Sequence, residues 1–390
     1  MRVLHVYRTF FPDSQGGLEE TIRQICLATQ SEGVECRVFA LSRDPQPNPV
    51  TVSGIPVYQA HLDLEVASCG ISFRCRRVFQ DAYAWADLIH YHFPWPFGDL
   101  LHLTTGPRKP SIVTYHSDIV RQRLLGHAYR PLMNRFLSSI DRVVCTSPNY
   151  FATSDTLSRF QHKVEVIPIG IDETTYPSVT DAEISATERS FGSGFFLFIG
   201  VFRYYKGLHI LLEAMKDAPY RVVIAGSGPT EASLRAQAAT LGLDNVIFAG
   251  QVSDAEKVAL LHLCAGIVFP SYLRSEAFGI TLLEGAMFGR PLVSTEVGSG
   301  TSHVNIDKET GYVVSPGSSR SLRHALDQLH TRPDVARIMG VKARRRFEQL
   351  FTGRRMGVRY AALYRQILGL PEDSHLPIAR AAISKPPRPA

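Results

Sequence analysis

The chain has 390 residues, of which 45% are hydrophobic and 20% are charged, and its formal net charge is +6 at pH 7. This composition is typical of a soluble globular protein, and the length suits two domains of ordinary size. No apolar run approaches the roughly 18 residues that a membrane-spanning helix needs, and the first residues resemble a strand rather than a signal peptide. Six scattered cysteines without a C-x-x-C motif favour a reduced, cytoplasmic protein over a disulfide scaffold or a zinc site.

Positive charge is concentrated towards the C-terminus. Residues 340–366 contain eight basic residues, from Lys342 to Arg365, and one acid, Glu348. Two interpretations remain open for this run: a solvated helix face, or a surface that meets anionic lipid headgroups. Nucleic acid is not expected as a partner, because no nucleic-acid-binding motif accompanies the charge.

Short apolar, β-branched segments alternate with helix-period segments along the whole chain. This alternation, with strands that are apolar nearly throughout, predicts parallel sheets covered by helices on both faces. Thirteen strands are expected, at residues 3–7, 35–41, 56–60, 88–92, 112–116, 142–146, 164–168, 195–200, 221–225, 245–249, 266–270, 291–294 and 311–314.

One sheet would be too wide for all these strands, so the sequence predicts two domains. The Pro-, Gly- and Thr-rich segment 167–183 marks the division. We expect an α/β fold of two doubly wound, Rossmann-like domains facing each other across a cleft, with ligands outside the carboxyl ends of the strands. The predicted bounds are 1–172 and 173–354, then a helix over 355–370 that packs back on the first domain, and a disordered Pro-rich tail over 371–390.

In the second half, two glutamates eight positions apart stand out in the stretch RSEAFGITLLEGAMFGRP. The sequence predicts a loop through Glu276 and a helix that begins near Gly279 and carries Glu284. The amides of Phe278, Gly279 and Ile280 would then form a site at a helix N-terminus, while the carboxylates suit sugar hydroxyls. The alternative is an ordinary capped surface helix.

Two further loops of the second half follow predicted strands. Arg203 and Lys206 precede a helix on what we expect to be a solvated loop, where two cations could clamp a diphosphate; an exposed basic turn is the alternative. Gly226 lies in a Gly-Ser-Gly turn after the next strand, which is a weak signal for a nucleotide contact, because Pro229 breaks the dinucleotide-binding pattern.

In the first half, Gly16 and Gly17 open a helix after the first strand, so their amides could meet a phosphate. His116 ends another strand, and Asp118 follows it. A strand-end histidine can contact substrate, although a lone histidine is more often structural, and that interpretation stays open.

The segment HYHFPWP places His90 and His92 two residues apart on one face of a predicted strand, but no further ligand is evident, so no metal site is expected. Residues 119–140 carry Arg121, Arg123, Arg130 and Arg135 beside an apolar stripe with four-residue spacing, formed by Leu124, Ala128, Leu132 and Phe136. This helix either faces the core or forms a basic surface for anionic membranes.

Together these motifs resemble a known enzyme family. The glutamate pair with its internal Phe-Gly, the R-x-x-K-G loop, the early Gly-Gly and the strand-end histidine are similar to those of family 4 retaining glycosyltransferases with the GT-B fold. The resemblance covers almost the whole chain. More closely, VYRTFFPD, YHFPWPFGD, VTYHSDIV, FRYYKGLHILLEA and SEAFGITLLEG resemble segments of mannosyltransferases that build bacterial O-antigen polysaccharides.

The resemblance implies roles for the second-half residues. Arg203 and Lys206 would hold the donor diphosphate, Glu284 the ribose, and Glu276 with the amides of residues 278–280 the donor sugar. Gly226 is a further nucleotide contact that the resemblance leaves open. The family's Pro-Glu after a glycine-rich turn is absent, because residues 298–302 read Gly-Ser-Gly-Thr-Ser.

In the first half, the resemblance implies that Gly16 and Gly17 approach the phosphates and that His116 contacts the donor sugar near the reacting carbon. Asp118 is a possible acceptor contact. His116 and Glu276 are thus the residues expected nearest the chemistry.

The implied reaction is metal-independent hexosyl transfer with retention. The donor would be GDP-mannose or GDP-D-rhamnose, and the acceptor a lipid-linked saccharide at the inner face of the cytoplasmic membrane. The sequence has no D-x-D motif, so charge on the leaving diphosphate would be met by Arg203, Lys206 and backbone amides. One alternative is the same transferase with a UDP-sugar donor. Two other protein classes are an NAD-dependent oxidoreductase, although this sequence lacks the G-x-G-x-x-G motif of that class, and a catalytically silent partner protein that binds a nucleotide sugar.

Overall fold

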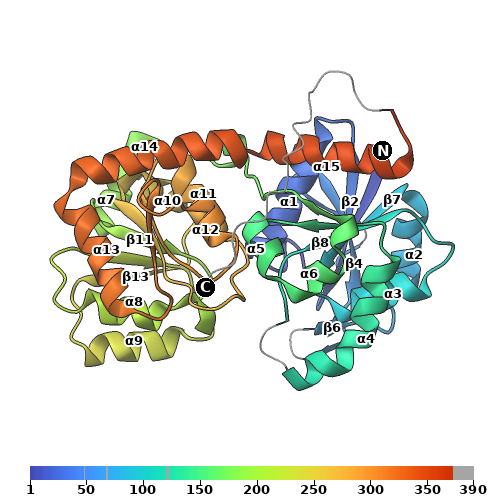
Figure 1. Cartoon of the computed structure of the whole chain (residues 1–390), viewed down its shortest axis with the longest axis horizontal. Helices are drawn as coiled ribbons and strands as arrows, with labels where there is room; N and C mark the ends of the chain where they lie inside the picture. Colours follow the sequence, from blue (N-terminus) through green and yellow to red (C-terminus); the bar gives the residue numbers. More distant parts are fainter. Residues whose placement is uncertain (48, 67–68, 120–122, 372–390) are drawn as a thin grey trace. The chain divides into compact units, whose positions relative to one another are not determined.

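The computed structural model describes residues 1–47, 49–66, 69–119 and 123–371 and divides into two compact units (Figure 1). The first unit comprises Met1–Gly170 together with the segment from Gly353 to the C-terminus, and the second comprises Ile171–Thr352. The sequence placed these divisions two residues later, at 172 and 354. Of the expected tail, residues 372–390 lie outside the described residues.

The first unit is built on one sheet of eight strands with the order β10-β9-β8-β7-β1-β2-β4-β3. All neighbours are parallel except β3 and β4, which form a hairpin. The strands are β1 Arg2–Val6, β2 Glu35–Ser42, β3 Val50–Val52, β4 Ile55–His61, β7 Leu88–Phe93, β8 Ser111–Tyr115, β9 Arg142–Cys145 and β10 Val164–Val166.

Helices cover this sheet on both faces, as parallel strands require. Strands β7 and β8 are buried at every residue, although β7 includes the polar side chains of His90 and His92. The helices of the unit are α1 Gly17–Gln30, α2 Arg76–Trp85, α3 Pro96–Thr104, α4 Arg123–Ser139, α5 Pro148–Thr153, α6 Asp155–Arg159 and α15 Gly353–Leu368.

The C-terminal helix α15 belongs to the first unit and lies beside α1 (Figure 1). The two helices approach closely at Gly357, where an added Cβ atom would lie 2.2 Å from the carbonyl oxygen of Ala28. Tyr360 and Tyr364 on α15 are buried in the same core as Cys26 and Ile22 of α1. Helix α15 therefore completes the core of the first unit.

The second unit has a parallel sheet of six strands with the order β13-β12-β11-β14-β15-β16. Its strands are β11 Phe196–Ile199, β12 Val222–Ala225, β13 Val246–Gly250, β14 Gly266–Phe269, β15 Leu292–Thr295 and β16 Gly311–Val314. Its helices are α7 Asp181–Phe191, α8 Leu208–Met215, α9 Glu231–Thr240, α10 Asp254–Leu263, α11 Ile280–Met287, α12 Thr301–Val304, α13 Ser319–Thr331 and α14 Pro333–Leu350.

Local sequence fixes the start of several helices. Before α10, the Ser253 hydroxyl accepts a hydrogen bond from the Glu256 amide, while the Glu256 carboxylate accepts one from the Ser253 amide. Thr180 and Glu183 repeat this capping box before α7. Such a cap stabilises a helix by about 1 kcal/mol.

The strand order creates one switch point in each sheet. In the second sheet, the chain runs from β11 outwards through β12 to β13 and then returns to β14, on the other side of β11. Loops that follow the two strands beside such a point diverge and leave room for a ligand. The loop after β11 carries Arg203 and Lys206, and the loop after β14 carries Glu276, so this fold brings the expected donor residues to one place.

All thirteen expected strands are present, and the prediction of two Rossmann-like sheets is confirmed. The sequence missed β3 and the two strands of a separate hairpin, β5 Leu64–Val66 and β6 Cys69–Ile71. Each has three residues, too few to show an alternating pattern. No helix among the described residues is long and apolar enough to span a membrane.

Candidate active site

The loop after β11 is held tightly against the loop after β14. Gly207 has a φ of +70°, and an added Cβ atom would lie 2.1 Å from the Pro270 carbonyl oxygen. The Tyr272 amide also donates a hydrogen bond to the Tyr205 carbonyl at 3.0 Å. Only glycine fits at position 207, and this contact fixes the turn that presents Lys206.

Lys206 and Glu276 form an ion pair across these two loops. The Lys206 Nζ lies 2.5 Å from Glu276 Oε2, and the Ser271 hydroxyl donates to the same oxygen at 3.1 Å. The Lys206 side chain is only 14% exposed, so the expectation of a solvated loop is wrong at this residue. Packing of the turn against Pro270, which sequence spacing does not show, removes Lys206 from solvent.

Arg203 differs from Lys206 in its surroundings. It is exposed at the start of the same turn, and its guanidinium has no hydrogen-bond or ion-pair partner within the part of the chain that the structure describes. The side chain is therefore available to an anionic group of a ligand.

Helix α11 begins at Ile280, as the sequence predicts, and Gly279 is its N-cap. The amides of Phe278, Gly279 and Ile280 have no hydrogen-bond acceptor among the described residues, as is usual at a helix start. The Phe278 ring is buried against Phe351. Residue 278 therefore offers its backbone, not its side chain, to a ligand.

Glu284 lies in α11 and is 5% exposed. Its Oε1 accepts a hydrogen bond from the Tyr176 hydroxyl at 3.0 Å and lies 3.2 Å from the Lys257 Nζ. Burial acts to lower the pKa of Lys257, but the Glu284 and Asp254 carboxylates outweigh it and raise that pKa above its usual value. The sequence did not reveal these partners, because Tyr176 and Lys257 belong to no motif around Glu284.

Gly226 follows β12 and touches the neighbouring loop. Its φ is +125°, and an added Cβ atom would lie 2.1 Å from the Gly200 carbonyl oxygen. Packing alone therefore explains the glycine at this position.

The segment that replaces the family's Pro-Glu is well ordered by its own contacts. Ser299 and Thr301 are fully buried, the Gly298 amide donates to Glu296 Oε1 at 2.9 Å, and the Gly300 amide donates to the Ala277 carbonyl at 2.8 Å. This segment thus packs directly behind the loop that carries Glu276.

In the first unit, Gly16 is the N-cap of α1 and Gly17 its first residue, as expected. The buried Glu19 carboxylate turns back over this end and accepts hydrogen bonds from the hydroxyls of Thr9 and Ser14, both at 2.8 Å. A phosphate beside Gly16 would meet this carboxylate. The second unit therefore offers stronger electrostatic support for a diphosphate than the Gly16–Gly17 turn does.

His116 follows β8 and is 6% exposed. Burial lowers its pKa to about 3, so the imidazole is neutral near pH 7. Its Nε2 lies 3.0 Å from His92 Nδ1, and its Nδ1 has no hydrogen-bond partner among the described residues. Asp118 differs, because its Oδ1 accepts hydrogen bonds from the hydroxyls of Tyr115 and Ser154, which is a structural role.

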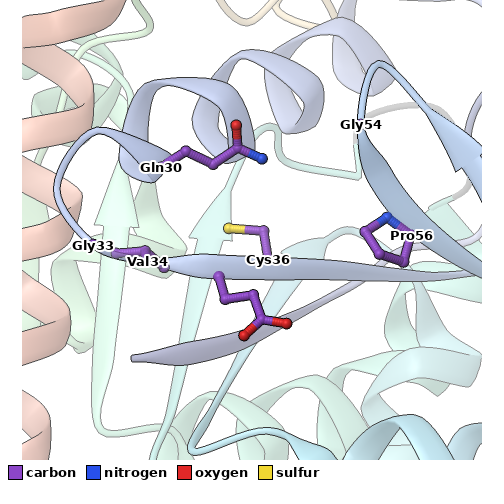
Figure 2. Close-up of a pocket in the computed structure, with 7 residues that line it drawn as sticks. Gln30, Gly33, Val34, Cys36, Gly54 and Pro56 are labelled. Atoms are coloured by element: carbon purple, nitrogen blue, oxygen red, sulfur yellow. The ribbon is translucent and has the colours of Figure 1, made fainter.

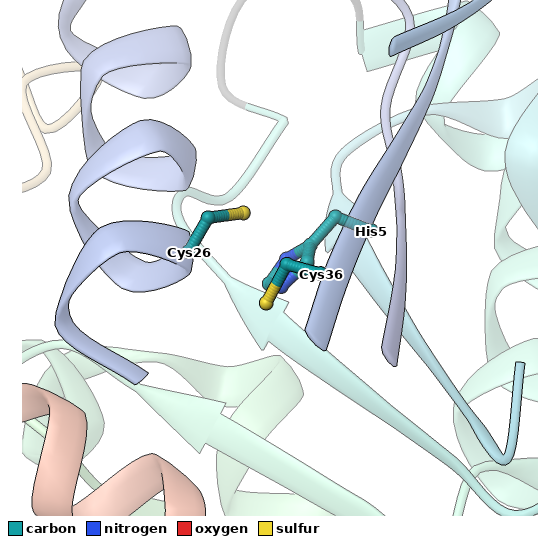
Figure 3. Close-up of side chains that lie close together, drawn as sticks. All are labelled: His5, Cys26 and Cys36. Atoms are coloured by element: carbon teal, nitrogen blue, oxygen red, sulfur yellow. The ribbon is translucent and has the colours of Figure 1, made fainter. Parts of the chain in front are cut away.

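The structure brings together potential metal ligands that the sequence showed as scattered. His5, Cys26 and Cys36 are buried, and one ligand atom from each lies within 4.8 Å of the others (Figure 3). His5, His90 and His92 form a second such group. The sequence did not single out His5, because its contacts to these residues exist only in the folded sheet. That the chain uses no metal stays a prediction.

A surface hollow of about 390 Å³ is lined by Gln30, Gly33, Val34, Glu35, Cys36, Gly54 and Pro56 (Figure 2). Glu35 is the first residue of β2, so this hollow lies at the amino ends of the strands. Ligands of doubly wound sheets bind at the opposite edge, and the hollow is not a candidate donor site.

The C-terminal basic run, residues 340–366, is only partly available to solvent or to lipid. In the C-terminal run, Arg344 pairs with Glu173 and Glu348, Arg346 donates to the His303 carbonyl, and Arg359 lies 3.6 Å from Glu165. Part of this run is therefore structural.

In α4, Arg130 and Arg135 are exposed and Phe136 is buried, whereas Ala128 of the expected apolar stripe is exposed. The expected stripe is therefore wrong at position 128. Residues 120–122, which include Arg121, lie outside the described residues.

Comparison with known families agrees with this arrangement. A family model described as Glycosyltransferase Family 4 matches residues 15–175, and one described as Glycosyl transferases group 1 matches residues 181–346. The chain belongs to the family 4 glycosyltransferases, and the resemblance found in the sequence is confirmed.

Two relatives are similar over nearly their full length. The D-rhamnosyltransferase WbpZ of Pseudomonas aeruginosa is 52% identical, over 90% of this chain and 92% of its own. The O-antigen chain mannosyltransferase C of Escherichia coli is 45% identical, over 94% and 99%. The chain is accordingly a glycosyltransferase.

Solved structures show the same fold. Sucrose-phosphate synthase from Thermosynechococcus elongatus superposes with a TM-score of 0.76 at 22% identity, covering 94% of this chain and 99% of its own. WaaG, a glycosyltransferase involved in lipopolysaccharide biosynthesis, superposes with a TM-score of 0.64 at 17% identity, covering 93% and 99%. The expected GT-B fold is confirmed.

Proposed function

We propose that this enzyme transfers a hexosyl residue, with retention, to a lipid-linked saccharide in O-antigen synthesis. The donor is GDP-mannose or GDP-D-rhamnose. The observation that carries the proposal is the convergence of Arg203, Lys206 and Glu276 at the switch point of the second sheet. The names of the two relatives, a D-rhamnosyltransferase and an O-antigen chain mannosyltransferase, support this choice of sugar and of O-antigen synthesis.

Each donor residue has a role that its surroundings support. Arg203 is exposed and offers a bidentate fork, and Lys206 offers a second positive charge. Together they would neutralise the diphosphate as it leaves, which is the step where negative charge develops. Glu276 and the amides of residues 278–280 would bind the sugar, and Glu284 the ribose.

The remaining assignments come from the family resemblance. His116 contacts the donor sugar near the reacting carbon, and Gly16 and Gly17 approach the phosphates. Gly226 and Asp118 are possible further contacts. The leaving phosphate accepts the proton of the acceptor hydroxyl in a front-face attack. The reaction uses no metal, and the enzyme acts in the cytoplasm, at the inner face of the membrane.

The test is transfer of radiolabelled sugar to a lipid-linked acceptor by the purified full chain. GDP-mannose, GDP-D-rhamnose and UDP-glucose are offered separately, and NADH oxidation is followed in parallel. We expect transfer from one GDP-sugar, in excess EDTA as well as without it. Transfer from UDP-glucose alone would overturn the donor assignment, and activity that EDTA abolishes and Mg²⁺ restores would overturn the metal-independent account.

Arg203→Ala provides a matched control for this assay. Arg203 is exposed and its guanidinium has no described partner, so the variant should fold normally. Loss of transfer in Arg203→Ala would link the measured activity to the proposed site. A wild type that binds the donor but shows no turnover would instead be a silent binding protein.

A further inference from the structure

The histidines of the first sheet occupy one face of three neighbouring strands. His5 on β1 is in register with His90 on β7, and His92 on β7 is in register with Thr114 on β8. Side chains two residues apart on a strand point to the same face. His5, His90, His92 and, two residues beyond Thr114, His116 therefore lie on the same side of the sheet.

Three of these rings are joined end to end by hydrogen bonds. His116 Nε2 lies 3.0 Å from His92 Nδ1, and His92 Nε2 lies 3.0 Å from His5 Nδ1. The planes of neighbouring rings are tilted by only 24° and 19°, with centroids 5.3 Å apart in both pairs. His92 therefore uses both of its nitrogens within this hydrogen-bonded row of His116, His92 and His5, which we call the histidine chain.

The two ends of the histidine chain differ. At one end, His116 keeps Nδ1 without a described partner, at the carboxyl end of β8. At the other end, the fully buried His5 has an Nε2 without a hydrogen-bond partner in the described chain, and its ring borders the thiols of Cys26 and Cys36 (Figure 3). A thiol can either donate to that nitrogen or accept from it.

Proton counting links the three rings. A neutral imidazole carries one N–H, so one nitrogen donates and the other accepts. Burial lowers the pKa of His92 and His116, which keeps these rings neutral. Because every link joins an Nδ1 to an Nε2, three neutral rings form both bonds only if all three have the proton on Nδ1 or all three have it on Nε2.

We propose that His92 and His5 are positioning residues for His116, and that the histidine chain locks the three rings into one common tautomer. With every proton on Nδ1, His116 presents an N–H donor to the sugar; with every proton on Nε2, it presents a bare acceptor. His5 thus selects, from two rings away, the group that His116 offers. The proposal rests on the proposed function only for the assignment of His116 to the donor sugar.

His90 provides a matched control inside the same cluster. Its ring lies 4.4 Å from that of His92, between centroids, and it is equally buried. Its nitrogens, however, bond to the hydroxyls of Tyr364 and Thr114. A hydroxyl can donate or accept, so the tautomer of His90 is independent of the histidine chain.

The first test needs no substrate. Long-range ¹H–¹⁵N correlation spectra of the full chain, labelled with ¹⁵N-histidine and assigned through single variants, report the protonated nitrogen of each ring. We expect the same tautomer in His5, His92 and His116. A mixture of Nδ1–H and Nε2–H rings among the three would overturn the proposal.

The second test measures turnover. Replacing either positioning residue frees the tautomer and orientation of His116, so His92→Phe and His5→Phe should each lower kcat, the former by roughly tenfold, with less change in KM for the donor. His92→Asn, whose amide group can still meet His116 Nε2, should recover part of the loss. His90→Phe should keep a kcat within about twofold of wild type.

The outcomes separate the two proposals. If His90→Phe loses as much kcat as His92→Phe, the cluster acts only through packing and the positioning role is wrong. An active wild type with mixed tautomers leaves the transferase function intact. A wild type inactive with every sugar nucleotide removes that function and leaves the tautomer result standing.

Discussion

Lys206 Nζ lies 2.5 Å from Glu276 Oε2, and the two side chains are 14% and 10% exposed. The pair links the loop after β11 to the loop after β14. The proposed function assigns Lys206 to the donor diphosphate and Glu276 to the donor sugar. When the donor binds, the two side chains therefore have to contact different parts of it. Lys206 is therefore part of the folded structure as well as of the site, which gives its substitution two separable effects.

Lys206→Ala should abolish most transfer and also destabilise the protein. A buried carboxylate that loses its described ion-pair partner costs about 2–3 kcal/mol, so the variant should unfold at a lower denaturant concentration. Arg203→Ala should lose transfer without that loss of stability, because Arg203 is exposed. Denaturant unfolding and transfer assays on both variants check the prediction.

The double variant Lys206→Met/Glu276→Gln is the control for the stability effect. It removes both charges, so stability should return towards wild type while transfer stays lost. If Lys206→Ala unfolds like the wild type, the ion pair contributes nothing to stability. Near-wild-type turnover in Lys206→Ala would show that Lys206 does not bind the donor diphosphate.

The two glutamates should differ in kinetics. Glu284 is assigned to the ribose, which changes little during the reaction, so Glu284→Gln should mainly raise KM for the donor. Glu276 is assigned to the sugar, where charge develops, so Glu276→Gln should mainly lower kcat. Steady-state kinetics with a varied donor concentration distinguish the two effects.

Lys257 extends this prediction. Its Nζ lies 3.2 Å from Glu284, so Lys257→Met should shift KM in the same direction as Glu284→Gln and leave kcat nearly unchanged. Full activity in both glutamate variants would mean that α11 is an ordinary capped helix. A kcat effect for Glu284→Gln without a KM effect would reverse the two assignments.

Much of the fold could be predicted from the sequence, because each buried parallel strand is a short apolar run and each helix has its own period. The start of α11 was predictable too, since Gly279 interrupts the helical pattern. Contacts between distant segments were not. His5 and His92 are 87 residues apart, and Tyr176 and Glu284 are 108 apart. Only the strand order and the packing of separate elements make them neighbours.

Buried and half-buried neutral histidines should make the free energy of unfolding fall in mild acid. Burial lowers the pKa of His102 and His303 to about 4 and that of His116 to about 3. Between pH 6.5 and these values the unfolded chain takes up protons that the folded chain does not. The stabilisation that these histidines contribute is therefore fully present above about pH 6.5. Below that pH the free energy of unfolding falls, by at most about 1.4 kcal/mol per pH unit for each histidine.

Calorimetric Tm values between pH 7 and pH 5 check this sign. His303→Phe, which replaces a half-buried base by an apolar ring of similar shape, should make the fall less steep. The exposed His162 offers a control, because His162→Asn should leave the slope unchanged. A Tm that rises as pH drops from 7 to 5 would contradict the prediction.

Residues 119–140 should bind anionic membranes through their arginines. Arg130 and Arg135 are exposed on α4, and each arginine near an anionic surface contributes about 1 kcal/mol at moderate salt. Changing Arg121, Arg123, Arg130 and Arg135 to Gln should thus reduce flotation with phosphatidylserine-containing vesicles by about tenfold or more, and added salt should weaken wild-type binding in the same way.

The control variant changes Arg320, Arg337, Lys342 and Arg345, which are exposed in the second unit, and so removes equal charge elsewhere. Equal losses in both variants would indicate that net charge alone drives binding, and a loss confined to the control variant would place the membrane surface on the second unit.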